Sequence, residues 1–180
     1  MIARRQLLQD QRGFSLSELL VASAVLGLML TGLVTVQMQG QQSYVIGAHR
    51  VEVQQNGRVA LDLMIRELRS TQAMTTLTSA TDVTFIDANG VTLEYKLTGT
   101  TLNRIAAGVP TPLIGGVQSL TMIYYSAYNG STNTGTTTTD PSQVTVIGIQ
   151  LVTGTEDRVA AGSAADQHAT MASMVRLRNM

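Results

Sequence analysis

The sequence predicts an α+β fold in which one long N-terminal helix packs on a small antiparallel β-sheet domain. Three observations lead to this prediction. The apolar residues gather in one run, Leu19 to Val36, which contains no charged residue. No proline lies between that run and Thr71, so nothing there breaks a helix sharply. After Ser70 the chain is rich in threonine, serine, glycine and β-branched residues, which favour strands and turns.

Composition limits the chemistry that this chain of 180 residues can carry. The length suits one modest domain with an appendage. The formal net charge is zero, so we expect no nucleic-acid partner. The absence of cysteine excludes a disulfide framework, a thiolate metal site and a cysteine nucleophile. With no Trp, two Phe and five Tyr, the chain has few side chains to line a large aromatic ligand pocket.

The apolar run is long enough to cross a membrane. It extends over about 18 residues, which is the threshold for a spanning helix. The basic residues Arg4, Arg5 and Arg12 precede it, so the positive-inside tendency predicts a cytoplasmic N-terminus and an exported C-terminal part. An ordinary secretory signal peptide is the alternative. Its apolar core is shorter, and it would not carry an acid such as Glu18 at the start of the run.

The junction before the apolar run carries the most specific motif in the chain. It reads Arg12-Gly13-Phe14-Ser15-Leu16-Ser17-Glu18-Leu19-Leu20. This combination resembles the cleavage and methylation motif of type IV prepilins and type II secretion pseudopilins. The resemblance implies that a membrane-bound prepilin peptidase cuts after Gly13 and methylates the new N-terminal residue, Phe14. Glu18 then becomes the fifth residue of the processed chain.

Glu18 needs a partner or a role, because a carboxylate within an apolar helix is costly. At mid-membrane such an acid costs about 2.5–3.5 kcal/mol on insertion scales. The resemblance implies that Glu18 of one subunit pairs with the Phe14 amine of a neighbour in a filament. Because an unpaired buried charge is expensive, this pairing would fix the register between subunits. The alternative is that Glu18 only reaches to the lipid headgroups.

We expect the helix to continue well beyond the membrane. From residue 14 to about residue 72 it would span about 90 Å, whereas the membrane core needs only about 30 Å. Its second half has an apolar stripe, formed by Gly57, Ala60, Leu61, Met64, Ile65 and Leu68. The opposite side carries Arg58, Asp62, Arg66 and Arg69, and the spacing of Asp62 and Arg66 predicts an ion pair.

Residues 55–69 add a second resemblance. The run Gln55-Asn56-Gly57-Arg58-Val59-Ala60-Leu61-Asp62, followed by Arg66-Glu67-Leu68-Arg69, is similar to a run in PilW-type minor pilins. Many major pilins have proline at the position occupied here by Thr35, so its absence argues mildly against a major subunit. The C-terminal half also resembles, more diffusely, the globular region of PilW-type and J-type pseudopilin subunits.

The C-terminal half predicts roughly six short strands in an antiparallel meander. The expected strands are 83–86, 91–97, 101–105, 117–125, 144–152 and 174–178. Residues 108–113 are expected as a connection, and 129–142 as a mobile polar loop. Residues 154–172 are expected as a second loop. The predicted organisation is therefore a cleaved leader (1–13), a membrane and assembly helix (14–38), a periplasmic amphipathic half of the helix (39–73) and a β domain (80–180) with a polar loop at 129–143.

The sequence contains no catalytic signature, and we expect neither an enzyme nor a cofactor. His49 and His168 are expected to be surface residues, and no nucleophile, histidine and acid set is evident. Asp82, Asp87, Asn89 and Asp140 offer oxygen ligands for Ca²⁺, but without EF-hand spacing, so no metal site is predicted.

Together these features predict a minor type IV pilin, a structural subunit that helps to initiate or cap pilus assembly. The closest alternative is a minor, J-like pseudopilin of a type II secretion system. A signal-anchored periplasmic binding or enzymatic domain is a third. The expected partners are other major and minor pilins through the N-terminal helix, prepilin peptidase and inner-membrane lipid. The expected location is the inner membrane, crossed once with the C-terminal domain in the periplasm, and then a pilus or pseudopilus near its tip.

Overall fold

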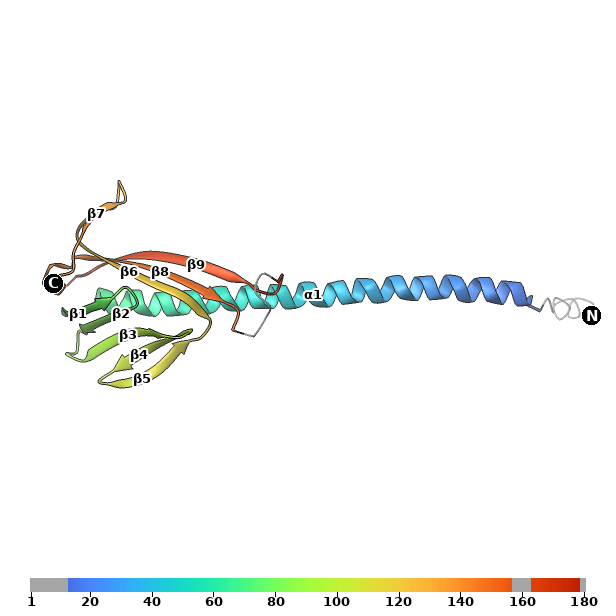
Figure 1. Cartoon of the computed structure of the whole chain (residues 1–180), viewed down its shortest axis with the longest axis horizontal. Coiled ribbons are helices and arrows are strands. Elements are labelled where there is room, and N and C mark those ends of the chain that lie inside the picture. Colours follow the sequence, from blue (N-terminus) through green and yellow to red (C-terminus); the bar gives the residue numbers. More distant parts are fainter. Residues whose placement is uncertain (1–12, 157–162, 179–180) are drawn as a thin grey trace, which may run out of the picture. The chain divides into compact units, whose positions relative to one another are not determined.

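The computed structural model describes residues 13–156 and 163–178, and these form one long helix followed by two antiparallel sheets. The helix packs against antiparallel strands, which confirms the predicted α+β class and a type IV pilin-like fold (Figure 1). Contacts divide the chain into two units, Met1–Tyr44 and Val45–Met180. The expected leader, 1–13, lies outside the described residues except for Gly13.

The helix α1 runs from Leu16 to Arg69 and carries the apolar run. In the first unit its side chains are all exposed, because no other element of that unit covers them in the described residues. The hydroxyl groups in this stretch are satisfied within the helix itself. Thr31 Oγ1 donates to the Gly27 carbonyl and Thr35 Oγ1 to the Thr31 carbonyl, both at 2.9 Å. A helix with internally bonded hydroxyls suits an apolar surrounding, where an unpaired polar group is costly.

The second unit holds the two sheets. The five-stranded sheet has the order β1-β2-β3-β4-β5, a meander in which neighbours in the chain are neighbours in the sheet. Its strands are Ala73–Ser79, Asp82–Ile86, Thr92–Thr98, Thr101–Ala106 and Val109–Ile114. The four-stranded sheet has the order β7-β6-β8-β9. Its strands are Val117–Asn129 (β6), Thr134–Thr137 (β7), Val146–Gly154 (β8) and His168–Arg176 (β9).

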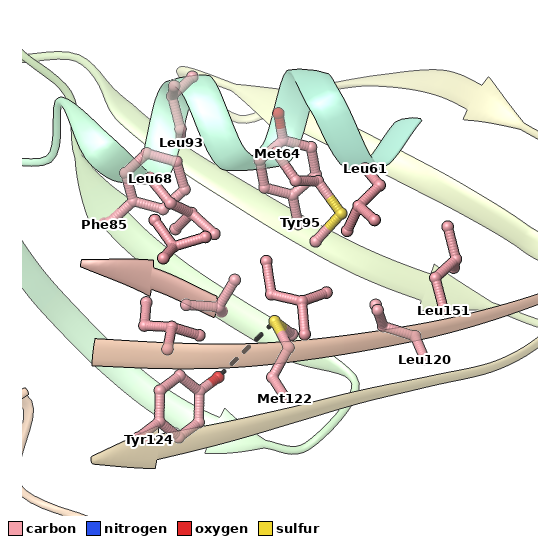
Figure 2. Close-up of a cluster of buried hydrophobic side chains, with 14 of the residues drawn as sticks. Leu61, Met64, Leu68, Phe85, Leu93, Tyr95, Leu120, Met122, Tyr124 and Leu151 are labelled. Carbon is pink, nitrogen blue, oxygen red and sulfur yellow. Dashed lines mark hydrogen bonds between the residues drawn. The ribbon is translucent and has the colours of Figure 1, made fainter. Parts of the chain in front are cut away.

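Both sheets and the second half of α1 share one hydrophobic core. The predicted apolar stripe is confirmed, since Gly57, Ala60, Leu61, Met64 and Leu68 are buried. Figure 2 shows Leu61, Met64 and Leu68 projecting from α1 toward side chains of both sheets. On the five-stranded side these are Phe85, Leu93 and Tyr95, and on the four-stranded side Leu120, Met122 and Leu151. Burying one such side chain contributes about 1.5–3 kcal/mol.

Gly57 allows the helix to lie very close to the four-stranded sheet. A Cβ at this position would stand 2.8 Å from Met171 Cε and 3.1 Å from Thr153 Oγ1. The Thr153 hydroxyl is buried and donates to the Val53 carbonyl of α1 at 3.0 Å. The sheet therefore contacts the backbone of the helix, which a larger residue than glycine would hold away.

Several predicted boundaries were wrong. The helix ends at Arg69, and the next strand, β1, begins at Ala73, so the helix does not reach residue 73. No strand was predicted at β1, because its threonine-rich sequence has no clear alternation. It forms by pairing Ala73 with Ile86 and Met74 with Phe85 of β2. Residues 109–114 form strand β5, where a connection was expected at 108–113. This is possible because β5 is an edge strand, where proline is tolerated.

The polar segment 129–143 is also more ordered than expected. It contains the short strand β7, which forms a hairpin with β6, and a 3-10 turn, Pro141–Gln143. Asp140 caps this turn by accepting a hydrogen bond from the Ser142 N–H at 3.0 Å. The closing strand β9 begins at His168, six residues before the predicted start at Met174, and so shortens the second predicted loop.

Candidate functional site

The Gly13–Phe14 junction lies just outside the helix. Gly13, Phe14 and Ser15 are non-helical, and α1 begins at Leu16. The Phe14 side chain is 82% exposed, so its own chain does not cover this bond. A peptide bond in non-helical, uncovered backbone is the kind that a protease can bind in extended form.

Ser15 and Glu18 form a reciprocal cap at the start of α1. The Glu18 N–H donates to Ser15 Oγ at 3.2 Å, while the Ser15 N–H donates to Glu18 Oε2 at 2.9 Å. Ser15 Oγ also lies 3.0 Å from Glu18 Oε2 and donates to it. This is the capping-box arrangement, in which a serine before the helix and a glutamate three residues later satisfy each other's backbone N–H groups. The spacing Ser15-x-x-Glu18 is a sequence signal for it that we did not use.

The cap leaves half of the Glu18 carboxylate open. Both hydrogen bonds from Ser15 end on Oε2, and Oε1 has no partner among the described residues. An ionised carboxylate has acceptor sites on both oxygens, so Oε1 can accept a further donor while the cap persists. The arrangement thus holds a negatively charged group in a fixed orientation at the first turn of α1.

The helix that follows is long and apolar enough to cross a membrane by length and composition. Its exposed apolar side chains begin at Leu16 and continue through Val36 and Met38. A large uncovered apolar surface of this kind marks contact with lipid or with other proteins.

Comparison with known families agrees with the helix and the junction. The family model described as the prokaryotic N-terminal methylation motif matches residues 8–34. No curated protein matches the chain. The motif and the long apolar helix define a membrane-anchoring N-terminus of the type found in pilins. In this N-terminal segment the chain is therefore similar to type IV prepilins and pseudopilins.

A cluster in the β domain was not foreseen from the sequence. Glu67 of α1 accepts a hydrogen bond from Tyr95 Oη at 2.6 Å, and Arg104 Nη2 lies 2.9 Å from Glu67 Oε1. Arg104 Nε donates to both carboxylate oxygens at 3.0 Å. Burial, with help from Glu67, raises the pKa of Tyr95 above its ordinary value. The Glu67 contact likewise raises the pKa of Arg104. The cluster ties the last turns of α1 to β3 and β4.

The remaining candidate residues lie apart from the N-terminal site. His49 Nδ1 is 3.7 Å from Glu52 in a largely buried position, which corrects the expected surface placement. His168 Nε2 is 3.1 Å from Asp166 and is about half exposed. Asp87 accepts hydrogen bonds from the Val91 and Asn89 N–H groups, and the Val91 bond above all holds the pKa of Asp87 below its usual range.

The side chains considered as Ca²⁺ ligands instead contact nearby groups of the protein. Asp87 and Asn89 share one turn, Asp140 caps another, and Asp82 lies 3.7 Å from Lys96. In residues 13–156 and 163–178, no three histidine or acidic side chains form a cluster that would hold a metal ion.

Proposed function

We propose that this protein is a minor type IV pilin, a structural subunit that is processed by prepilin peptidase and helps to initiate or cap a pilus. The observation that carries the proposal is the N-terminal segment. An uncovered Gly13–Phe14 bond directly precedes a capped, apolar helix, and the methylation-motif model matches there. Cleavage after Gly13 would leave the helix attached, so the helix would serve assembly.

The proposed assembly contact joins Glu18 to the amine of Phe14 in a neighbouring subunit. Ser15 supports this role, because its two hydrogen bonds orient the carboxylate and leave Oε1 open. An ammonium group on Oε1 would form a charge-assisted hydrogen bond in an apolar surrounding, where such bonds are strong. N-methylation keeps the positive charge of the amine, so the modified residue can still pair.

We propose that the protein crosses the inner membrane once, with residues 14–38 in the lipid and the β domain in the periplasm. From there it would enter the filament near its tip. Its partners would be other major and minor pilins, which pack against the apolar helix. The similarity of residues 55–69 to PilW-type minor pilins and the absence of proline at Thr35 support a minor subunit.

The test is mass spectrometry of the N-terminus after expression with and without a prepilin peptidase. We expect a chain that starts at N-methylated Phe14 with the peptidase and an intact leader without it. The variant Gly13→Ala should stay unprocessed in both cases. A mature chain that begins beyond the apolar run would overturn the proposal, since an ordinary signal peptidase would then have removed the helix.

A second measurement separates a pilus from a secretion pseudopilus. Sheared filaments are purified from cells that assemble type IV pili and from cells that assemble a pseudopilus, each expressing the processed protein. We expect the subunit in the pilus preparation at a small fraction of the major pilin. Incorporation only into the pseudopilus would assign the protein to the secretion machine instead.

A further inference from the structure

The arginine residues of the second unit are almost all without an acidic partner among the described residues. The described residues of this unit include Arg50, Arg58, Arg66, Arg69, Arg104, Arg176 and Arg178. In this part of the chain only Arg104 has a carboxylate within 4.0 Å. Even Asp62 and Arg66, which are spaced for an ion pair on α1, do not form one among the described residues. In a chain of zero net charge, so many unpaired guanidinium groups need an explanation.

Most of these arginines line one seam, between α1 and strand β9. A groove of about 680 Å³ is lined by Arg50 and Arg58 on the helix, by Gln167, and by His168 to Met171 at the start of β9. A second groove, of about 720 Å³, is lined by Arg66 and Arg69 on the helix and by Arg178 after the strand. Asp62 is the one acid among the residues that line the two grooves. The seam is therefore strongly positive.

The same seam exposes an unpaired strand edge. β9 is the last strand in its sheet among the described strands, and it pairs with β8 in a register without shifts. Gln167 accepts from the Thr155 N–H, and Leu177 donates to the Thr145 carbonyl. In an antiparallel pair the bonded positions alternate, so odd-numbered residues bond to β8. The backbone groups of Thr170, Ala172 and Met174 therefore point to the free edge, where the described residues offer them no partner.

The other sheet edges are protected, and β9 is not. β5 carries Pro110 and Pro112, β7 has only four residues, and β1 has two register shifts. Short strands, prolines and irregular pairing are the usual ways in which natural proteins block strand addition. β9 has nine residues, no proline and regular pairing. Its open edge thus differs from the other three.

We propose that the seam between α1 and β9 binds an extended acidic segment of another protein, which pairs with the free edge of β9 and places carboxylates on Arg58 and Arg66. Strand addition would supply the backbone hydrogen bonds, and the arginines would supply charge-assisted contacts. This inference rests on the second unit alone and does not depend on cleavage after Gly13.

The dimensions of the seam define the length of the bound segment and the spacing of its acidic residues. Arg58 and Arg66 are two helical turns apart, about 12 Å along the axis. In an extended peptide, residues four positions apart on one side are about 13 Å apart, so acids at that spacing match the two arginines. The nine residues of β9 run for about 30 Å, room for a partner strand of about nine residues. No two acidic residues of this sequence are four positions apart, so a second copy lacks such a segment and is not the occupant we propose.

The test uses the full chain in non-ionic detergent micelles and a synthetic probe. The probe is an extended peptide of about ten residues, rich in Thr and Val, with Glu at every fourth position. We expect it to bind in fluorescence anisotropy and to protect the amides of Thr170, Ala172 and Met174 from hydrogen exchange. The amides of Ala169 and Met171 should change little, because they already bond to β8.

Two pairs of variants separate charge from strand pairing. Arg58→Glu with Arg66→Glu should weaken binding at least about tenfold, whereas Arg58→Lys with Arg66→Lys should retain most of it, because the charge is kept. Thr170→Pro removes one edge donor and should also weaken binding, whereas Thr170→Val keeps that N–H and should bind normally.

Three results would overturn the proposal. The first is no binding of the probe at millimolar concentration. The second is equal binding of a peptide with the same charges and several prolines. That result would show that the seam binds negative charge without strand pairing. The third is tighter binding of a short single-stranded DNA of similar length, which would make the seam a nucleic-acid site. Because wild-type hydrogen exchange is the main readout, the test remains decisive even if Thr170→Pro does not fold.

Discussion

At the scale of single residues, Ser15 and Glu18 show how one acid can serve both its own helix and a neighbour. Oε2 of Glu18 takes part in the cap at Ser15, and Oε1 is open. A capping box satisfies two backbone donors that would otherwise be unpaired at the end of an apolar helix. The cap thus lowers the cost of placing an acid at this point, and the proposed pairing uses the oxygen that the cap leaves.

The two roles of Glu18 are separable by substitution. Glutamine can replace glutamate in a capping box but carries no charge. Glu18→Gln and Glu18→Ala should both be cleaved, and both should fail to enter filaments, because each lacks the charge that pairs with the amine. Ser15→Ala should lose only the cap, worth about 1 kcal/mol, and should enter filaments at a reduced level.

Immunoblots of sheared filaments and of membranes provide the measurement for these three variants. The membrane fraction controls for expression and processing. Normal incorporation of Glu18→Gln would show that the cap alone matters and that no intersubunit charge pair exists at this residue.

Tyr95 makes the stability of the fold depend on pH in the alkaline range. Burial raises the pKa of Tyr95 in the folded state, while in the unfolded chain the phenol ionises near its ordinary value of 10.0. The contribution of the neutral Tyr95 phenol to folding stability is therefore fully present below pH 10 and is lost as the pH rises further. The loss reaches about 1.4 kcal/mol per pH unit for one such tyrosine. Tyr124, whose pKa is also raised by burial, adds a second contribution of the same sign.

Urea unfolding of the full chain in micelles at pH 8 to 11 would measure this dependence. Tyr95→Phe should cost about 1 kcal/mol at pH 8, because the hydrogen bond to Glu67 is lost, but it should flatten the alkaline decline. Tyr44→Phe, at an exposed position, is the matched control and should leave the decline unchanged. An unchanged slope in Tyr95→Phe would contradict the assignment.

At the scale of elements, the contact between α1 and the four-stranded sheet depends on Gly57. Replacing a helical glycine by alanine ordinarily stabilises a helix by about 1 kcal/mol. At Gly57 the new Cβ would press on Met171 and on Thr153, whose hydroxyl bonds to the Val53 carbonyl. Overpacking of this kind costs about 1–3 kcal/mol, so Gly57→Ala should destabilise the domain by about 1 kcal/mol overall.

Gly47 is the matched control on the same helix. It is exposed, and a Cβ there would have no neighbour within 4 Å, so Gly47→Ala should stabilise the chain by about 0.5–1 kcal/mol. Thermal unfolding followed by circular dichroism would compare the two. A double variant with Met171→Ala should recover part of the loss at Gly57, since the crowded atom would be gone. Stabilisation by Gly57→Ala alone would show that the contact is loose.

The sequence predicted those elements whose signal is local. The apolar run and the stripe through Leu61, Met64 and Leu68 both follow from residues close in the chain. β1 and β5 were missed because they depend on partners. β1 is a strand through its pairing with β2, and β5 can contain two prolines because only one of its sides pairs.

In the candidate site, too, features with a local sequence signal were predicted and features that depend on distant residues were not. Gly13, Phe14 and Glu18 were predicted from a motif of contiguous residues, and their processing and pairing remain predictions. The bond network of Glu67, Tyr95 and Arg104 joins residues far apart in the sequence, so no local pattern revealed it. The open seam between α1 and β9 was also invisible in sequence, because an edge strand is defined by the neighbour that it lacks.

At the scale of the whole molecule, the buried core belongs to one unit. Every buried residue of α1 lies from Val53 onward, and the two sheets contribute the rest of the core. Residues 16–38 of the helix are mostly apolar and are exposed, so they contribute surface and not core. The β domain with the second half of the helix should therefore fold without the membrane segment, which predicts a soluble fragment.

A fragment that starts at Val45 should be monomeric in detergent-free buffer and should unfold in one cooperative transition, because both sheets share the same core with α1. Its melting temperature should lie within about 4 °C of that of the full chain in micelles, a shift that corresponds to about 1 kcal/mol. A shorter fragment that starts at Val59 lacks Val53 and Gly57, and it should lose the Thr153 hydrogen bond to the helix and melt substantially lower. Size-exclusion chromatography and circular dichroism would measure both fragments. Aggregation of the Val45 fragment, or a melt without a cooperative transition, would show that the first 44 residues are needed for folding and not only for anchoring.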